Sequence, residues 1–221
     1  MEYYRGQEVS ERIEQAHVAA LERRAYESRL SQSDSVRYGA PSQMTDTPLH
    51  QQGLAPDCLL QCARMAEHRQ TGRDPGLVAF KQPAIEQNIY NQDGVTDVDK
   101  FVSVLNDRDG VQAEGSYAAS PEAILDSLNQ RKSVIVGVNA YEYYKVESNL
   151  EPNSGGHALL VTGAERQDNG RWQFTVNDPN QETPNFPVDG ERLLPAWKAE
   201  GNLLITVEKR AGGQDGNPNN W

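Results

Sequence analysis

The sequence holds two cysteines, Cys58 and Cys62, in the run DCLLQC. Asp57 is a good N-cap residue and Gly72 a good helix terminator, so a helix is predicted from Cys58 to about Gln70. Cys58 would then lie at the helix N-terminus, where unpaired N–H groups and a partial positive charge stabilise a thiolate. A cysteine in this place could act as a nucleophile. The alternative is that Cys58 is a small buried apolar residue, as free cysteines often are.

A second residue able to do chemistry is His157, which begins the predicted strand HALLVTGAE after two glycines. From there its imidazole could take the proton of a thiol and later give it to a leaving amine. The next predicted strand, WQFTVND, ends at Asp178, whose carboxylate could hold the other ring nitrogen. Asn177 is the alternative orienting residue, because an amide can perform this task and adjacent strand residues face opposite sides. A surface histidine and an ordinary Asp-Pro turn are the non-catalytic alternatives.

Two residues upstream of the helix bear on the same chemistry. Gln52 lies six residues before Cys58, and its amide could bind an oxyanion together with the backbone N–H of Cys58. Asp57 works against the nucleophile, because a nearby carboxylate raises the pKa of a thiol. We therefore expect the Asp57 side chain to turn onto backbone N–H groups as a helix cap.

The order of these residues along the chain resembles that of the papain-like cysteine peptidases. It is most similar to the C39-like subgroup, the double-glycine peptidases found in bacteriocin-processing enzymes and in delivered bacterial toxins. The resemblance implies that Cys58 is the nucleophile, His157 the base and Asp178 the orienting residue. It also implies that Gln52, or in its place Gln51, contributes to the oxyanion hole, and it implies no cofactor and no metal.

The resemblance extends over residues 49–208 and is incomplete. C39-type enzymes usually have a glycine soon after the cysteine, whereas Leu59 follows Cys58 here. Their glutamine also often lies closer to the cysteine, which affects the assignment of Gln52 more than that of Cys58.

The elements that must position these residues are helical first and stranded second. Beyond the helix at Cys58, helices are predicted from Thr96 or Asp97 and after Ser120. Short β-branched runs then predict strands at 133–140, 157–165, 172–178 and 202–208. This order favours an α+β fold of papain-like type, in which a helical half carrying the nucleophile packs on an antiparallel sheet carrying the histidine and the aspartate.

Three regions are predicted along the chain. Residues 1–48 comprise a charged helix at 8–30 followed by a polar linker, residues 49–210 form the peptidase domain, and residues 211–221 have the composition of disorder.

The overall charge and the cysteine content exclude several classes of function. The net charge is −11 and the isoelectric point is near 4.8, without a cluster of lysines and arginines, so neither nucleic acid nor a membrane surface is expected as a partner. No apolar run approaches the roughly 18 residues of a membrane span, and no Sec-type signal is visible at the start. Two cysteines four apart on a helix are poorly placed for a disulfide, which favours action in the cytoplasm.

Other polar residues are given structural interpretations. Cys62 is expected in the core, and a metal site built from Cys58, Cys62 and His68 is not expected, because no second ligand pair follows at zinc-finger spacing. His50 is expected to be solvated. The run YEYY at 141–144, with the loop that follows it, is interpreted either as a mobile wall of a substrate cleft or as an exposed hairpin connection.

The sequence thus predicts a cysteine endopeptidase that cuts a protein in the cytoplasm beside small residues such as Gly-Gly. The resemblance favours a bacterial toxin or effector, delivered by a specialised secretion system and inhibited by an immunity protein. Two alternatives remain open. One is a glutamine deamidase or transglutaminase-like effector using the same Cys-His-Asp site, and the other is a non-catalytic binding module.

Overall fold

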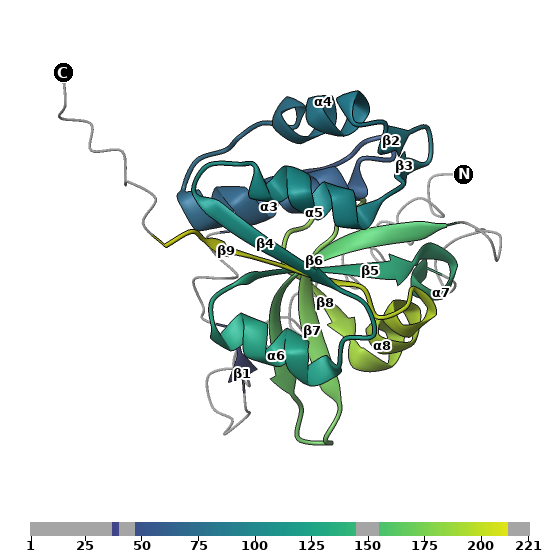
Figure 1. Cartoon of the computed structure of the whole chain (residues 1–221). Coiled ribbons are helices and arrows are strands. Elements are labelled where there is room, and N and C mark those ends of the chain that lie inside the picture. Colours follow the sequence, from purple (N-terminus) through teal and green to yellow (C-terminus); the bar gives the residue numbers. More distant parts are fainter. Residues whose placement is uncertain (1–36, 40–46, 145–154, 212–221) are drawn as a thin grey trace, which may run out of the picture. The chain divides into compact units, whose positions relative to one another are not determined.

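An antiparallel sheet with helices on both faces organises the part of the chain that the computed structural model describes, residues 37–39, 47–144 and 155–211 (Figure 1). The strand order is β4-β9-β5-β6-β7-β8, and β1 pairs with the far end of β6. The strands of this sheet are β1 (Arg37–Tyr38), β4 (Val111–Ser116), β5 (Ser133–Asn139), β6 (Gly156–Arg166), β7 (Trp172–Asn177), β8 (Phe186–Asp189) and β9 (Leu204–Lys209). A separate small hairpin pairs β2 (Tyr90–Asn91) with β3 (Gly94–Val95).

The helices divide between the two faces of the sheet (Figure 1). One face is covered by α3 (Cys58–Thr71), α4 (Val78–Glu86) and α5 (Val98–Asn106). The opposite face is covered by α6 (Pro121–Asn129), α7 (Ala140–Tyr144) and α8 (Gly190–Ala199). None of the described helices is long and apolar enough to cross a lipid bilayer.

The central strands β5 and β6 are buried on both sides, which explains their nearly continuous apolar sequences. In β6, Ala158 and Leu160 enter the core beneath α3, whereas Leu159 and Val161 enter the core beneath α6–α8. This alternation follows from the two-residue period of a strand. The alternation therefore determines which side chains of β6 share a face of the sheet with a given side chain of β7.

A register shift between β6 and β7 determines the face of the sheet on which the residue after β7 lies. The two strands pair Gly163 with Thr175 but Val161 with Val176, so Thr162 is an extra residue in β6. The Thr162 hydroxyl is held by the carbonyl oxygen of Thr175 at 3.2 Å. Beyond this shift Leu160 pairs with Asn177, so Asn177 shares the face of Leu160 and the following residue lies on the other face.

Helix α3 begins at Cys58 and ends at Thr71, and the next residue, Gly72, has a φ of 72°, the left-handed conformation that glycine adopts readily. Both ends confirm the sequence prediction. The predicted role of Asp57 is wrong, because its carboxylate makes no capping bond. The two carboxylate oxygens instead accept from Lys81 Nζ at 3.0 Å each, and Tyr90 donates its hydroxyl to the same group. An ammonium and a phenol compete better for this buried carboxylate than backbone N–H groups do.

The α+β class and the elements predicted around the site are confirmed, and further elements were not predicted. Helices α4 and α8 contain Pro83 and Pro195 in their interiors, where proline normally argues against a helix. Strand β4 has a weak β-forming sequence and, among the described strands, pairs only with β9. Within the predicted linker, Arg37–Tyr38 form β1, whereas the predicted charged helix at 8–30 and all but the first residue of the predicted tail lie outside the described residues.

Replacing Lys81 by methionine should destabilise the protein by about 2 kcal/mol, because the nearly inaccessible Asp57 carboxylate would lose its cation. Lys100→Met is the matched control, since Lys100 pairs with Asp97 on the exposed surface. Urea unfolding of both variants measures the difference. Equal stability of the two variants would contradict this account of Asp57.

Candidate active site

The thiol of Cys58 lies at the first residue of α3, with its sulfur held by several hydrogen-bond donors. Backbone N–H groups of Leu59 and Ala158 donate to it, and the His157 side chain makes a hydrogen bond with it. The helix thus supplies one donor and strand β6 supplies the others. Docking of α3 on the end of β6 brings together two residues that are far apart in the sequence.

His157 is buried at the start of β6, opposite Val138 of β5. Its Nε2 lies 2.8 Å from Oδ1 of Asp178. Since that nitrogen faces the carboxylate, Nδ1 is the ring atom left for the thiol of Cys58. The imidazole therefore bridges the sulfur and the carboxylate.

Asp178 is fully buried directly after β7 and receives hydrogen bonds on both oxygens. The hydroxyl of Tyr144 donates to Oδ2 at 2.6 Å, and the backbone N–H of Asn180 donates to Oδ1 at 2.9 Å. Asn177 faces the other way: its Nδ2 donates to the carbonyl oxygen of Thr47 at 3.1 Å. Of the two candidate orienting residues, Asp178 is the one in contact with His157.

These contacts set the charges of the three groups. Burial alone would raise the pKa of Cys58, but the hydrogen bond and charge of His157, with the two backbone donors, lower it overall. Burial alone would lower the pKa of His157, but Asp178 and Cys58 outweigh it and raise the value to about 9. For Asp178, burial alone would raise the pKa, but the bonds from His157, Tyr144 and Asn180 outweigh burial and lower the pKa overall. The arrangement favours a thiolate, an imidazolium and a carboxylate at neutral pH.

Cys62 has the opposite environment from Cys58 one helical turn earlier. It is fully buried, and this burial raises the pKa of its thiol well above the ordinary range. The predicted core position is confirmed. Both cysteines are free, as expected for this spacing.

Tyr144 is a member of the site that the sequence analysis did not find. Its hydroxyl lies within 3.1 Å of His157 Nε2 and donates to Asp178, and burial together with that carboxylate raises its pKa. For the run 141–144 itself neither interpretation is correct, because these residues belong to helix α7, in which Tyr143 and Tyr144 are buried. Most of the loop that follows, residues 145–154, lies outside the described residues. The available signal was the position of the run directly after the buried strand 133–139.

The two glutamines proposed for an oxyanion hole differ in placement. The backbone N–H of Gln52 donates to the carbonyl oxygen of Pro179 at 3.0 Å, one residue after Asp178. Its Oε1 is buried and has no hydrogen-bond partner among the described residues. The exposed Gln51 directs its Nε2 to the carbonyl oxygen of Gln181 at 3.2 Å. The backbone of Gln52 is therefore tied to the aspartate segment, whereas its buried Oε1, an acceptor, could not itself bind an oxyanion.

A pocket of about 160 Å³ opens beside the Cys58–His157 pair. Its walls come from the start of α3, the β2–β3 hairpin, the first residue of α5, strands β5, β6 and β9, and the segment after α8. The described side chains and backbone that line it are those of Cys58, Leu59, Asp93, Gly94, Val95, Val98, Ile135, Gly137, Gly156, His157, Ala158, Glu200, Leu203 and Ile205.

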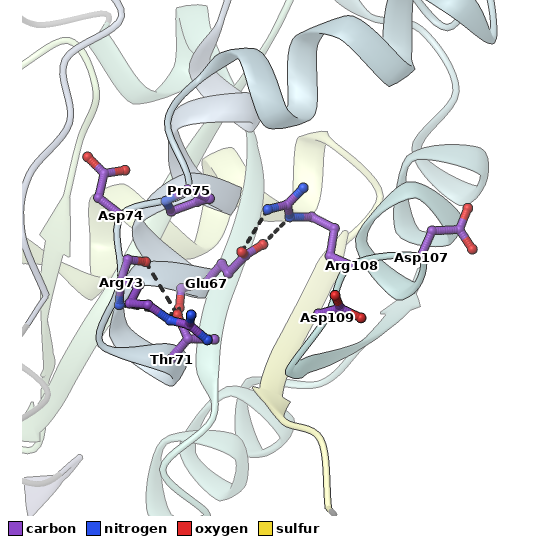
Figure 2. A pocket seen from close by; sticks show the side chains of 8 residues that line it. All are labelled: Glu67, Thr71, Arg73, Asp74, Pro75, Asp107, Arg108 and Asp109. Atoms are coloured by element: carbon purple, nitrogen blue, oxygen red, sulfur yellow. Dashed lines mark hydrogen bonds and ion pairs between the residues drawn. The ribbon is translucent and has the colours of Figure 1, made fainter. Parts of the chain in front are cut away.

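A second, larger hollow of about 450 Å³ lies at the other end of α3 (Figure 2). Glu67 and Arg108 form an ion pair across it, with one N–O distance of 2.8 Å. Asp107 and Asp109 lie on the Arg108 side (Figure 2). The described residues that line this hollow include neither a cysteine nor a histidine, so it does not share the chemistry of the Cys58 pocket.

One group of described residues has the composition of a metal site: His50, His68 and Asp74, with ligand atoms within 4.8 Å of one another. The carboxylate is already occupied, because Arg64 donates to it from Nε at 2.7 Å and from a second nitrogen. Arg64 also places a positive charge where a cation would bind. His50 is partly buried and stacks on His68, so the expectation that it is solvated is wrong.

Comparison with solved structures finds the same fold in a protein of Bacillus anthracis assigned as a C39-like peptidase. The TM-score is 0.54 at 15% sequence identity, and the similarity covers 80% of this chain and 99% of that chain. The chain has the papain-like fold of the C39-like peptidases. Scans against protein-family models and against curated proteins give no match.

At pH 7, iodoacetamide should alkylate Cys58 far faster than Cys62, because Cys58 is partly exposed with a lowered pKa, whereas Cys62 is buried with a raised pKa. His157→Ala should slow alkylation of Cys58 roughly 30-fold, since an ordinary thiol is only a few per cent ionised at this pH. In the wild type the rate should persist as the pH falls from 9 to 7, whereas in the variant it should fall with the thiolate fraction.

Peptide mass mapping of both cysteines against time measures these rates. His68→Ala is the control, because His68 lies on the same helix without contacting Cys58. Equal, slow reaction of Cys58 and Cys62 in the wild type would favour a non-catalytic binding module instead.

Proposed function

We propose that this protein is a cysteine peptidase, with Cys58 as nucleophile, His157 as general base and acid, and Asp178 as the orienting residue. The observation that supports it best is the continuous contact from Cys58 through His157 to Asp178, at a helix N-terminus and beside a pocket. The papain-like fold adds support, because it is the fold of a protein assigned as a C39-like peptidase.

In the first half of the reaction, the Cys58 thiolate attacks the carbonyl carbon of a peptide bond. The new C–S bond pushes electrons onto the carbonyl oxygen, which becomes an oxyanion. When the oxyanion collapses, the C–N bond breaks, and the His157 imidazolium gives its proton to the departing amine. Asp178 holds the imidazole in place and compensates its charge while the ring is protonated.

In the second half, water hydrolyses the thioester. His157, now neutral, takes a proton from the water while its oxygen attacks the thioester carbon. The C–S bond then breaks, which releases the carboxylic acid and restores the thiolate beside an imidazolium. The enzyme returns to its starting charge state without a cofactor.

Gln52 is proposed to stabilise the oxyanion together with the backbone N–H of Cys58. In support, the backbone N–H of Gln52 is hydrogen-bonded to the carbonyl oxygen of Pro179, next to Asp178. Gln51 is less suitable, because its amide is exposed and bonded to Gln181.

The substrate is proposed to be a protein in the cytoplasm, cut beside a small residue such as glycine. The proposed biological role is that of a bacterial toxin or effector, whose active site a partner immunity protein would block. These finer proposals rest on the resemblance of the Cys-His-Asp arrangement to C39-like enzymes.

Expression of the wild type in the cytoplasm of a bacterium should slow growth and produce new protein N-termini, whereas Cys58→Ala should do neither. The alanine variant lacks the nucleophile but keeps the fold. Mass spectrometry of labelled N-termini compares the two strains. A mass gain of about one unit on glutamine side chains, with unchanged termini, would replace the peptidase proposal by a deamidase.

Gln52→Ala should lower kcat about 100-fold and leave KM nearly unchanged, because an oxyanion donor acts in the transition state. Gln51→Ala is the matched control and should keep wild-type kcat. Both constants are measured on a peptide spanning a cleavage site found by N-terminal mapping. Equal activity of the two variants would remove Gln52 from the oxyanion hole.

A further inference from the structure

The pocket beside Cys58 combines apolar walls with one acidic group. Val95, Val98, Leu203 and Ile205 supply aliphatic surface, and Glu200 supplies a carboxylate. Its volume of about 160 Å³ is below the 300–1,000 Å³ typical of sites for whole small molecules, so a single side chain is a better match.

Glu200 lies close to the reactive pair. A Cβ built at Gly156 would lie 2.9 Å from Oε1 of Glu200, so the carboxylate rests against the backbone one residue before His157. A side chain at position 156 would displace the carboxylate from this place. The carboxylate therefore forms part of the pocket immediately beside the catalytic histidine.

The position of Glu200 is unfavourable for a carboxylate in the protein alone. The side chain is partly buried, which raises its pKa, and no described residue pairs with it. It is also the residue that ends α8, where the negative end of the helix dipole repels an anion. None of the described lining residues is a lysine or an arginine, and Asp93 adds a second negative charge.

We infer that this pocket is a substrate subsite for a lysine or arginine side chain near the scissile bond. The aliphatic stem of such a residue would cover the apolar walls while its cationic end pairs with Glu200. This inference rests on the proposed peptidase function and refines it. The residue at the scissile carbonyl stays small, and a basic residue before it supplies the recognition.

The subsite can be tested with peptide chloromethyl ketones that end in glycine, in which the thiolate of Cys58 displaces chloride and forms a permanent C–S bond. Lysine and norleucine are compared at each of the two positions before the glycine, because norleucine has the same carbon stem without the charge. At one of these positions, lysine should speed labelling of wild-type Cys58 about tenfold over norleucine.

Glu200→Gln should reduce this ratio to about one, because the lysine probe loses its ion pair and the norleucine probe has none to lose. Asp109→Asn, which removes an exposed acid from the other hollow, is the matched control for net charge and should keep the tenfold ratio. Glu200→Gln should not destabilise the protein in urea, because the carboxylate has no described partner.

Two failures are distinguishable. If iodoacetamide labels Cys58 rapidly but lysine gives no advantage at either position, or keeps its advantage in Glu200→Gln, the subsite is overturned and the nucleophile stands. If iodoacetamide labels Cys58 no faster than Cys62, the proposed function fails and the subsite fails with it.

Discussion

The contact between the Cys58 thiol and the His157 imidazole is the interaction on which the site depends. Each partner alone is in the wrong charge state, because burial favours a neutral thiol and a neutral imidazole. Together, and with Asp178 on the other side of the ring, they favour the charged pair. The contact forms because the apolar face of α3 packs on the sheet and sets the helix N-terminus against the first residues of β6. The hydrophobic core thus determines the ionisation of the nucleophile.

Two carboxylates lie close to this pair, and the fold treats them in opposite ways. Asp57 directly precedes the nucleophile, and its carboxylate is bound by the ammonium of Lys81 and the hydroxyl of Tyr90. Asp178 is aimed at the imidazole, and the Tyr144 hydroxyl holds it there. The charge of Asp57, which would hinder ionisation of the sulfur, is compensated by a cation, whereas the charge of Asp178 is oriented so that it supports the imidazolium.

The sequence was sufficient for the main features because local rules and chemistry agreed there. The N-cap and the terminal glycine located α3, and strand patterns placed His157 and Asp178 at the ends of adjacent strands. Tyr144 and Glu200 were not found, because a tyrosine after a strand and a glutamate after a helix acquire their roles only through tertiary contacts. The choice between Asn177 and Asp178 was also open, since it depends on strand register. Lys81, distant in sequence, overrode the expected cap at Asp57.

The register shift at Thr162 determines whether the Asp178 carboxylate can reach His157. Had β6 and β7 paired regularly past Gly163 and Thr175, with Thr162 opposite Val176, Asp178 would lie opposite Leu160, on the α3 side of the sheet. Pro179, which has neither a charge nor a side-chain acceptor, would then occupy the place from which the carboxylate reaches His157. A regular ladder that included Thr162 would therefore separate the carboxylate from the imidazole, although every residue of the site would still be present in the sequence.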